Sequence, residues 1–338
     1  MAVDGVTERG ATRNDVARLA GVSAAVVSYV VNDGPRPVAE GTRERVLDAI
    51  AKLGYRPNAP ARWLTTGRAD LVALLVPDLQ NPYFAALARA VEDAVQERGL
   101  GLVLVQTQGQ PGGHCNEVIV DRVSGLMATG IISASLPTPV GMRALTALST
   151  PVVVMSIAGA AGPFSGVWPD YEQGTRAAVR HLAVDHGHER IALVIGSTAE
   201  QQDQREQAYR SVLRELGLAE PVVVRTRWSM AGGREAASEV LAHQPRVTAV
   251  FAASDQQATG LLAGLYEAGV SVPGDLAVAA FDASPEAEFT VPPLTSAGSS
   301  MSVMATEAVD LLLRGTEATR IADPASLVIR RSCGCNAR

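Results

Sequence analysis

The stretch DVARLAGVSAAVVSYVVN, residues 15–32, contains two short helical patterns separated by Gly21. Apolar residues recur at helical spacing on both sides of this glycine, which permits a sharp turn. Ser23 is a good N-cap for the second helix, and Val22 and Val27 can fill the angle between the two helices. The pattern is typical of a helix-turn-helix, whose second helix presents its outer face to a DNA major groove.

The residues around this motif complete a predicted headpiece. The first helix is expected to begin at Asn14-Asp15, and a third over residues 42–53 should end at Gly54. The expected apolar positions of the first and third helices are Val16, Leu19, Ala20, Val46, Leu47, Ile50 and Leu53. We therefore predict a headpiece over residues 12–57, preceded by a flexible N-terminus over residues 1–11.

After Arg68 the chain alternates strand-like apolar runs with amphipathic helices, from Leu71–Val76 to Leu327–Ile329. Such alternation predicts right-handed crossovers and parallel sheets covered by helices on both faces. More than ten strands are too many for one sheet of this length, so two α/β lobes with a cleft between them are expected over residues 69–331. Residues 332–338 are expected to form a tail.

Composition excludes several classes of protein. The chain has 338 residues, 47% hydrophobic and 19% charged, which suits two or three packed domains and excludes a disordered chain. No apolar run reaches the roughly 18 residues of a membrane helix, and the first residues lack a secretory signal. With three cysteines and no sign of an oxidising compartment, a cytoplasmic location is expected.

The charge is distributed unevenly along the chain. Residues 1–68 hold ten Lys and Arg against seven Asp and Glu, whereas the remaining 270 residues hold 19 against 28. A basic head on an acidic body is common in nucleic-acid-binding proteins. Ordinary variation in surface charge explains so small a difference equally well, so the motifs must decide.

Three segments, beginning at Thr12, Thr42 and Leu53, resemble conserved parts of the LacI/GalR (lactose repressor) family: TRNDVARLAGVS, TRERV and LGYRPN. The similarity extends from Thr12 to Ser332. It implies a small all-α helix-turn-helix headpiece, a hinge helix and linker over residues 58–68, and a two-lobed α/β body with parallel sheets, similar to periplasmic binding proteins.

The resemblance also implies which residues contact DNA. Ala24, Ala25 and Tyr29 would read bases, and the alternative for the two alanines is that they serve only for packing. Because alanine has no hydrogen-bonding side chain, Tyr29 is the remaining long polar reader, and DNA shape must supply much of the specificity. The full expected set, including phosphate contacts, is Thr12, Ser23, Ala24, Ala25, Ser28, Tyr29, Asn32, Thr42, Asn58, Arg62 and Leu64.

The expected hinge, NAPARWLTT over residues 58–66, has an asparagine cap and a proline in its first turn. Two turns of helix do not hold alone in water, so we expect it to fold only when paired with its symmetry mate on DNA. By resemblance, Leu64 is the wedge that enters the minor groove and kinks the duplex. The alternative is that Leu64 and Trp63 pack on the body.

A ligand of a two-lobed α/β protein is expected beyond the carboxyl ends of the strands. Tyr83 and Phe84 follow the first strand and would line the cleft, or belong to the core. The resemblance implies that Arg205 contacts an effector, that Trp228 stacks on it, and that Asp255 accepts hydrogen bonds from its hydroxyl groups. A surface arginine and a helix cap are the alternatives for Arg205 and Asp255.

The cleft also departs from the family pattern. Ser156 stands where relatives have an Asp-Arg pair, whose arginine meets the effector, so the ligand would be less polar than usual, or absent. Asp282 belongs to a segment that resembles a family motif at a crossover between the lobes. The expected effector set is Tyr83, Phe84, Ser156, Arg205, Trp228, Asp255 and Asp282.

Metal binding and catalysis have no support in the sequence. His181, His186 and His188 are expected to serve packing and hydrogen bonding, and the two thiols of Cys333 and Cys335 alone do not complete a tetrahedral zinc site. No Walker loop, catalytic pair or nucleophile elbow occurs. We therefore expect no metal, no cofactor and no enzymatic activity.

These observations predict a transcriptional regulator, most simply a repressor. It would bind a near-palindromic double-stranded DNA operator as a homodimer, with no membrane partner, under control of a small-molecule effector such as a sugar or related metabolite. A dimer rather than a tetramer is expected because the chain ends soon after Arg331 without leucine heptads. The alternative is a periplasmic-type solute-binding protein with no regulatory role.

Overall fold

The computed structural model describes residues 11–31, 37–56, 63, 67–107, 115–135, 137–155, 162–201, 203–315 and 318–336. The chain divides into two compact units, residues 1–69 and 70–338. Each unit has its own hydrophobic core. All but the last residue of the expected flexible N-terminus lies outside the described residues.

The headpiece contains α1 (Arg13–Ala20), α2 (Ala24–Val31) and α3 (Glu40–Leu53), which confirms the three expected helices. Their first turns differ from the prediction. Thr12 caps α1 through a capping box with Asp15, so this helix begins one residue before Asn14. Helix α3 begins at Glu40, two residues earlier than expected.

The headpiece core is smaller than the sequence suggested. Val16, Val27 and Val46 are fully buried, together with small residues of the same helices, whereas Leu19 and Leu47 are about half exposed. Leu53 is also exposed. At about 100° per residue, the buried positions of α1 (Val16, Ala17, Ala20) span a narrow sector whose flank holds Leu19. Alanines at the contacts therefore replace the predicted leucines.

The second unit contains two six-stranded sheets. In the N-terminal lobe the order is β11-β5-β4-β3-β1-β2, formed by Arg320–Asp323, Ser165–Pro169, Val152–Val154, Ala128–Ser133, Ala69–Val76 and Gly101–Gln106. In the C-terminal lobe it is β12-β10-β9-β8-β6-β7, formed by Ser326–Val328, Thr295–Gly298, Ala277–Phe281, Ala249–Ala252, Ile191–Ile195 and Val222–Arg225. Both sheets have parallel pairs as predicted, and the edge strand β12 is antiparallel to β10.

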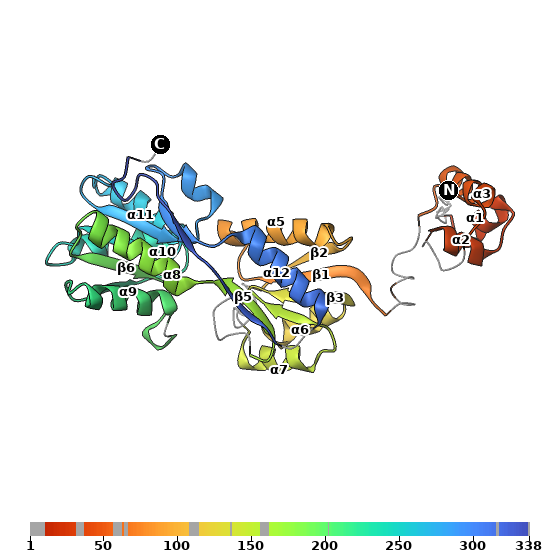
Figure 1. Cartoon of the computed structure of the whole chain (residues 1–338), viewed down its shortest axis with the longest axis horizontal. Coiled ribbons are helices and arrows are strands. Elements are labelled where there is room, and N and C mark those ends of the chain that lie inside the picture. The colour runs from red at the N-terminus through yellow and green to blue at the C-terminus, as the bar shows by residue number, and fades with distance from the viewer. Residues whose placement is uncertain are drawn as a thin grey trace, which may run out of the picture. The chain divides into compact units, whose positions relative to one another are not determined.

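Helices cover both faces of each sheet (Figure 1). Alternate residues of a buried strand point to opposite faces, so Leu74 of β1 joins one core with α5 and α12, whereas Leu75 joins the other with α6 and α7. In the C-terminal lobe, α8 and α9 cover one face and α10 and α11 the other. The bounds are Pro82–Gln96 (α5), Glu117–Ser124 (α6), Pro139–Ala147 (α7), Tyr171–Arg180 (α8), Gln204–Glu215 (α9), Met230–Ala242 (α10), Asp255–Glu267 (α11) and Met301–Arg314 (α12).

The chain crosses between the lobes three times: from β5 to α8, from β10 to α12, and from β11 to β12 (Figure 1). These crossings confirm the two-lobed body. The body continues into the expected tail, because Ser332 and Cys333 are buried in the C-terminal lobe and the Ser332 hydroxyl donates to the Val278 carbonyl at 2.6 Å. Across the described ranges, every helix falls short of the length and hydrophobicity that a bilayer crossing requires.

Candidate functional site

The outer face of α2 is the candidate DNA-reading surface. Ala25 and Ser23 are exposed, whereas Ala24, Ser28 and Tyr29 are half-buried, and Ala24 packs against the headpiece core. The Ser23 hydroxyl accepts a hydrogen bond from the Val26 backbone at 3.3 Å, so Ser23 caps α2 as predicted. Apart from Tyr29, this face offers short side chains.

The two threonines expected to contact DNA also stabilise their own helices. Thr12 donates its hydroxyl to Asp15 at 2.6 Å, and these hydrogen bonds from Thr12 lower the pKa of Asp15. Thr42 accepts a hydrogen bond from the Arg45 guanidinium at 3.3 Å. The remaining expected DNA contacts, Asn32, Asn58, Arg62 and Leu64, lie outside the described residues.

In the body, Arg205 is buried at the start of α9 and is fixed by Asp203, the N-cap residue of that helix. Its Nε and Nη2 atoms donate to the two Asp203 carboxylate oxygens at 2.9 and 2.8 Å. Its Nη1 atom donates to the Ala253 carbonyl, at the end of β8, at 3.0 Å. Arg205 is therefore not a surface arginine.

Two aromatic rings enclose the same guanidinium. Its carbon lies 4.7 Å from the centre of the Tyr171 ring and 4.6 Å from that of the Trp228 ring, both within the range of cation–π attraction. Trp228 packs so closely over Gly196 that a Cβ atom there would lie 2.5 Å from the indole. Trp228 is thus positioned by protein contacts on Arg205 and Gly196.

The Asp203–Arg205 pair is ionised. Burial alone would raise the pKa of Asp203, but the charge of Arg205 and its hydrogen bonds outweigh burial and lower this pKa to about 2. Burial likewise opposes the charged form of Arg205, and Asp203 more than compensates, so the pKa of Arg205 is raised. The pair therefore places a fixed cation beside the ends of β6 and β8.

Asp255 follows β8 and is almost fully buried. Ser254, not Asp255, caps α11, so the helix-cap alternative for Asp255 is wrong. Its carboxylate accepts hydrogen bonds from the Ser284 backbone at 2.7 Å, the Ser284 hydroxyl at 2.9 Å and the Ser296 hydroxyl at 2.5 Å. Burial outweighs these bonds and raises the pKa of Asp255 to about 6.

Asp282 follows β9 and lies beside Asp255, whose backbone N–H donates to the Asp282 carboxylate at 3.3 Å. Its φ of 121° is in the region that favours glycine, which indicates that the backbone holds this side chain in a strained position. Burial, and then the neighbouring charge of Asp255, raise the pKa of Asp282 well above its usual value.

A cavity of about 230 Å³ lies between the two lobes. It is lined by Asn81, Pro82, Met230, Asp255, Gln256, Thr259, Asp282, Ser284, Glu286, Phe289 and Thr290. Asn81 and Pro82 begin α5 of the N-terminal lobe, and the other residues belong to the C-terminal lobe. Its acidic lining comes directly after β8 and β9, at the carboxyl ends where a ligand was expected.

The two aromatic residues at the start of α5 belong to the N-terminal core, and one of them also lies close to the C-terminal lobe. Tyr83 and Phe84 meet edge to face, with ring centres 5.2 Å apart, and both pack against the N-terminal core. Burial raises the pKa of Tyr83, and the proximity of Tyr171 and Asp282 raises it further. Tyr83 thus lies near the polar groups of the C-terminal lobe. Ser156 is outside the described residues.

Comparison with known proteins matches both units. Residues 12–58 match "Bacterial regulatory proteins, lacI family", and residues 163–333 match the "Periplasmic binding protein-like domain". Catabolite control protein A of Priestia megaterium is 33% identical over 289 residues, which cover 83% of this chain and 85% of that protein. The chain belongs to the lacI family of bacterial regulatory proteins.

Two solved structures of transcriptional regulators are similar over nearly the whole chain. The Lac repressor dimer bound to operator and the anti-inducer ONPF has a TM-score of 0.84 and 26% identity, covering 96% of this chain and 99% of that one. The CelR–cellobiose complex has a TM-score of 0.69 and 32% identity, covering 95% and 99%.

Family membership settles the class of function. This lacI-family protein is a DNA-binding transcriptional regulator, and its similar proteins are regulators rather than enzymes. The alternative of a solute-binding protein with no regulatory role is not favoured, because the headpiece matches the regulator family.

The sequence analysis missed two residues that shape the site of this lacI-family regulator. Asp203 fixes Arg205, and Tyr171 covers one face of its guanidinium. Asp203 could have been found from its place two residues before Arg205, at the start of a predicted helix. The contact of Tyr171 with Arg205 could not be found from spacing along the chain, because α8 and α9 meet only through tertiary packing.

Proposed function

We propose that this regulator is a repressor that binds a near-palindromic operator as a homodimer. A helix-turn-helix reads a half-site of a few base pairs, and two copies related by a two-fold axis read a palindrome. The observation that supports this assignment is the face of α2, with exposed Ala25 beside Tyr29, on a headpiece with its own core. The protein acts in the cytoplasm and without catalytic turnover.

The effector in this proposal is a small polyhydroxylated molecule, such as a sugar, bound between the lobes. Arg205 does not belong to the lining of the cavity, but it lies close enough to Asp282 for its charge to oppose the rise in the pKa of that residue. Of its five N–H groups, three have acceptors among the described residues, which leaves two donors for a ligand oxygen. Asp282 and Asp255 add carboxyl groups at the cavity. The cellobiose in the CelR complex is consistent with a ligand of this class.

Selection of bound fragments from random duplex DNA, at fixed near-physiological salt, tests the operator. A two-fold symmetric motif is the expected result, because each half-site meets an identical helix. Binding that depends on salt alone, with no enriched sequence even after addition of metabolite pools, would contradict operator recognition.

Titration with a panel of mono- and disaccharides tests the effector. Because coupling is reciprocal, a true effector changes operator affinity by the same factor by which operator changes effector affinity. Arg205→Lys keeps the positive charge but loses the two-pronged contact with Asp203, so it should weaken effector binding while specific operator binding remains. A sugar that binds without changing operator affinity would contradict the effector assignment.

A further inference from the structure

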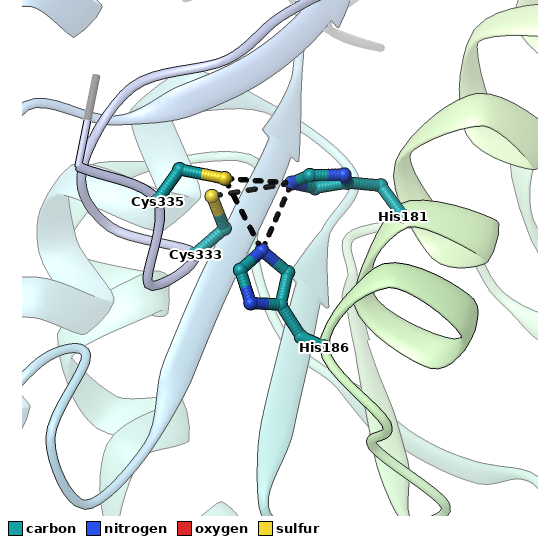
Figure 2. A group of neighbouring side chains, drawn as sticks. All are labelled: His181, His186, Cys333 and Cys335. Atoms are coloured by element: carbon teal, nitrogen blue, oxygen red, sulfur yellow. Dashed lines mark hydrogen bonds between the residues drawn. The ribbon is translucent and has the colours of Figure 1, made fainter.

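Four side chains that are far apart in the sequence of the C-terminal lobe come together at one point outside the cleft. His181 and His186 lie in the segment that follows α8, and Cys333 and Cys335 lie in the last turn of the described chain (Figure 2). One nitrogen or sulfur atom of each lies within 4.8 Å of the others. Figure 2 shows these atoms pointing toward a common centre.

Four of the six separations between these atoms match those of ligands around one tetrahedral ion, and all six are within 4.8 Å. With Zn–S of about 2.3 Å and Zn–N of about 2.05 Å, a tetrahedron places two nitrogens about 3.3 Å apart and a nitrogen about 3.6 Å from a sulfur. The His181 and His186 Nε2 atoms are 3.2 Å apart. The nitrogen–sulfur distances are 3.3 Å for His181–Cys333, 3.6 Å for His181–Cys335 and 3.3 Å for His186–Cys335.

The polar groups around the cluster suit ligands rather than ordinary packing. The Nδ1 atom of His181 lies 2.7 Å from an Asp185 carboxylate oxygen, so it carries the proton and leaves the Nε2 lone pair directed at the cluster. The Thr295 hydroxyl donates to the Cys333 sulfur at 3.1 Å, as it would to a thiolate.

The backbone explains how each pair of ligands is presented on one side. Residues 181–185 form a single π-helical turn after α8. Such turns are rare in proteins overall, and those that occur are often found at functional sites. Between the cysteines, Gly334 has a φ of 107°, and a Cβ there would lie 3.3 Å from the His186 ring. The positive φ therefore favours glycine at this turn, and any larger residue would also press on the His186 ring.

We propose that His181, His186, Cys333 and Cys335 bind one zinc ion that joins the C-terminal segment to the end of α8. Two imidazoles and two thiolates form a common closed structural zinc set, with no open position for catalysis. The sequence analysis expected no metal because the two thiols alone do not complete a tetrahedral zinc site. The fold brings two histidine nitrogens to these thiols and so provides the two missing ligands. His188, the third histidine of the sequence cluster, instead contacts the Thr248 hydroxyl at 3.2 Å.

Metal content is the first test of this site. The full-length chain is purified without chelator, and zinc is measured by mass spectrometry, with one ion per chain expected. After removal of zinc, addition of Co²⁺ should give the visible bands of tetrahedral cobalt and a sulfur-to-cobalt charge-transfer band. A chain that is folded, has its thiols reduced, and binds neither ion at one equivalent would overturn the proposal.

Matched variants locate the site. Cys335→Ser and His186→Gln each remove one half-buried ligand, and either should reduce bound zinc by at least about tenfold. Cys115→Ser and His188→Gln remove a thiol and an imidazole outside the cluster and should retain one equivalent. If all four variants bind zinc equally, the ion is elsewhere and the assignment is wrong.

The Asp185→Asn variant keeps all four ligands and changes only the hydrogen bond that orients His181. It should weaken zinc affinity by about 10–100-fold and leave the stoichiometry at one. An unchanged affinity, together with an unchanged cobalt spectrum in the two ligand variants, would show that the four side chains meet only by packing.

Discussion

The DNA-reading face of α2 and the effector side of the C-terminal lobe are built from opposite kinds of side chain. On α2, Ala25 is exposed and Ala24, Ser28 and Tyr29 are half-buried, and none of these side chains carries a charge. In the C-terminal lobe, Arg205, Asp203 and Asp255 are buried and held by several hydrogen bonds each.

This difference indicates how each region would achieve specificity for its ligand, DNA bases on α2 and the effector in the lobe. Short, uncharged side chains distinguish bases mainly through apolar contact and close approach, so they need support from DNA shape and from the hinge. Buried charges fixed by the protein are costly to disturb, and they orient a ligand with little rearrangement. Substitutions should therefore have larger effects in the lobe than on α2.

The largest effect is expected for Arg205→Ala. It leaves the Asp203 carboxylate buried and unpaired, which should lower the free energy of unfolding by about 3–5 kcal/mol. The matched control is Arg227→Ala, which breaks the exposed pair with Glu235 and should cost less than about 1 kcal/mol. Urea unfolding measures both, and equal losses would contradict the view that this lobe is rigidly preorganised.

The next effect is expected for Leu64→Ala in the predicted hinge. If Leu64 is a wedge that kinks the operator, its loss should weaken specific binding by on the order of 2–3 kcal/mol and leave non-specific binding nearly unchanged. Titrations against operator and random duplex at one salt concentration measure both. A loss of the same size on both duplexes would show that Leu64 does not act as a wedge.

A smaller effect is expected for Tyr29→Ala. As the long polar side chain of the reading face, Tyr29 should contribute about 1–3 kcal/mol and a preference at one base pair in each half-site. Repeating the duplex selection with the variant measures this preference. Tyr266→Ala removes an exposed tyrosine of the body and serves as the control. A motif that stays the same would remove Tyr29 from the set of base readers.

The sequence predicted the architecture far better than the details of the sites. Periodicity and turn residues located the three headpiece helices and the alternating strands, because these patterns are local. The burial of Ala17 and Ala49 in place of Leu19 and Leu47 depends on how closely the helices approach, which no local pattern encodes.

The same limit applies to the sites. Arg205 and Asp255 were found from a resemblance, but the Tyr171 and Ser296 side chains that hold them come from distant elements. The convergence of Cys333 with His181 joins positions 152 residues apart, and neither segment alone contains a complete ligand set. Apart from Asp203, which lies two residues before Arg205, the residues missed were those separated in sequence and joined only by tertiary packing.

The smallest effect is a change in pH dependence at Asp255. Its pKa is about 6 when folded against 3.8 in the unfolded chain, so its neutral form adds stability below pH 3.8 that is lost as pH rises through 6. Asp203, with a pKa near 2, acts oppositely and at lower pH, where stability is lost as pH falls below 3.8.

In Asp255→Asn, the slope of unfolding free energy between pH 4 and 6 should become less negative, by up to about 1.4 kcal/mol per pH unit. Denaturant unfolding at several pH values measures this slope. An identical slope in the variant would mean that Asp255 ionises as freely in the fold as in the unfolded chain, which would remove buried charge as the distinction between this lobe and the face of α2.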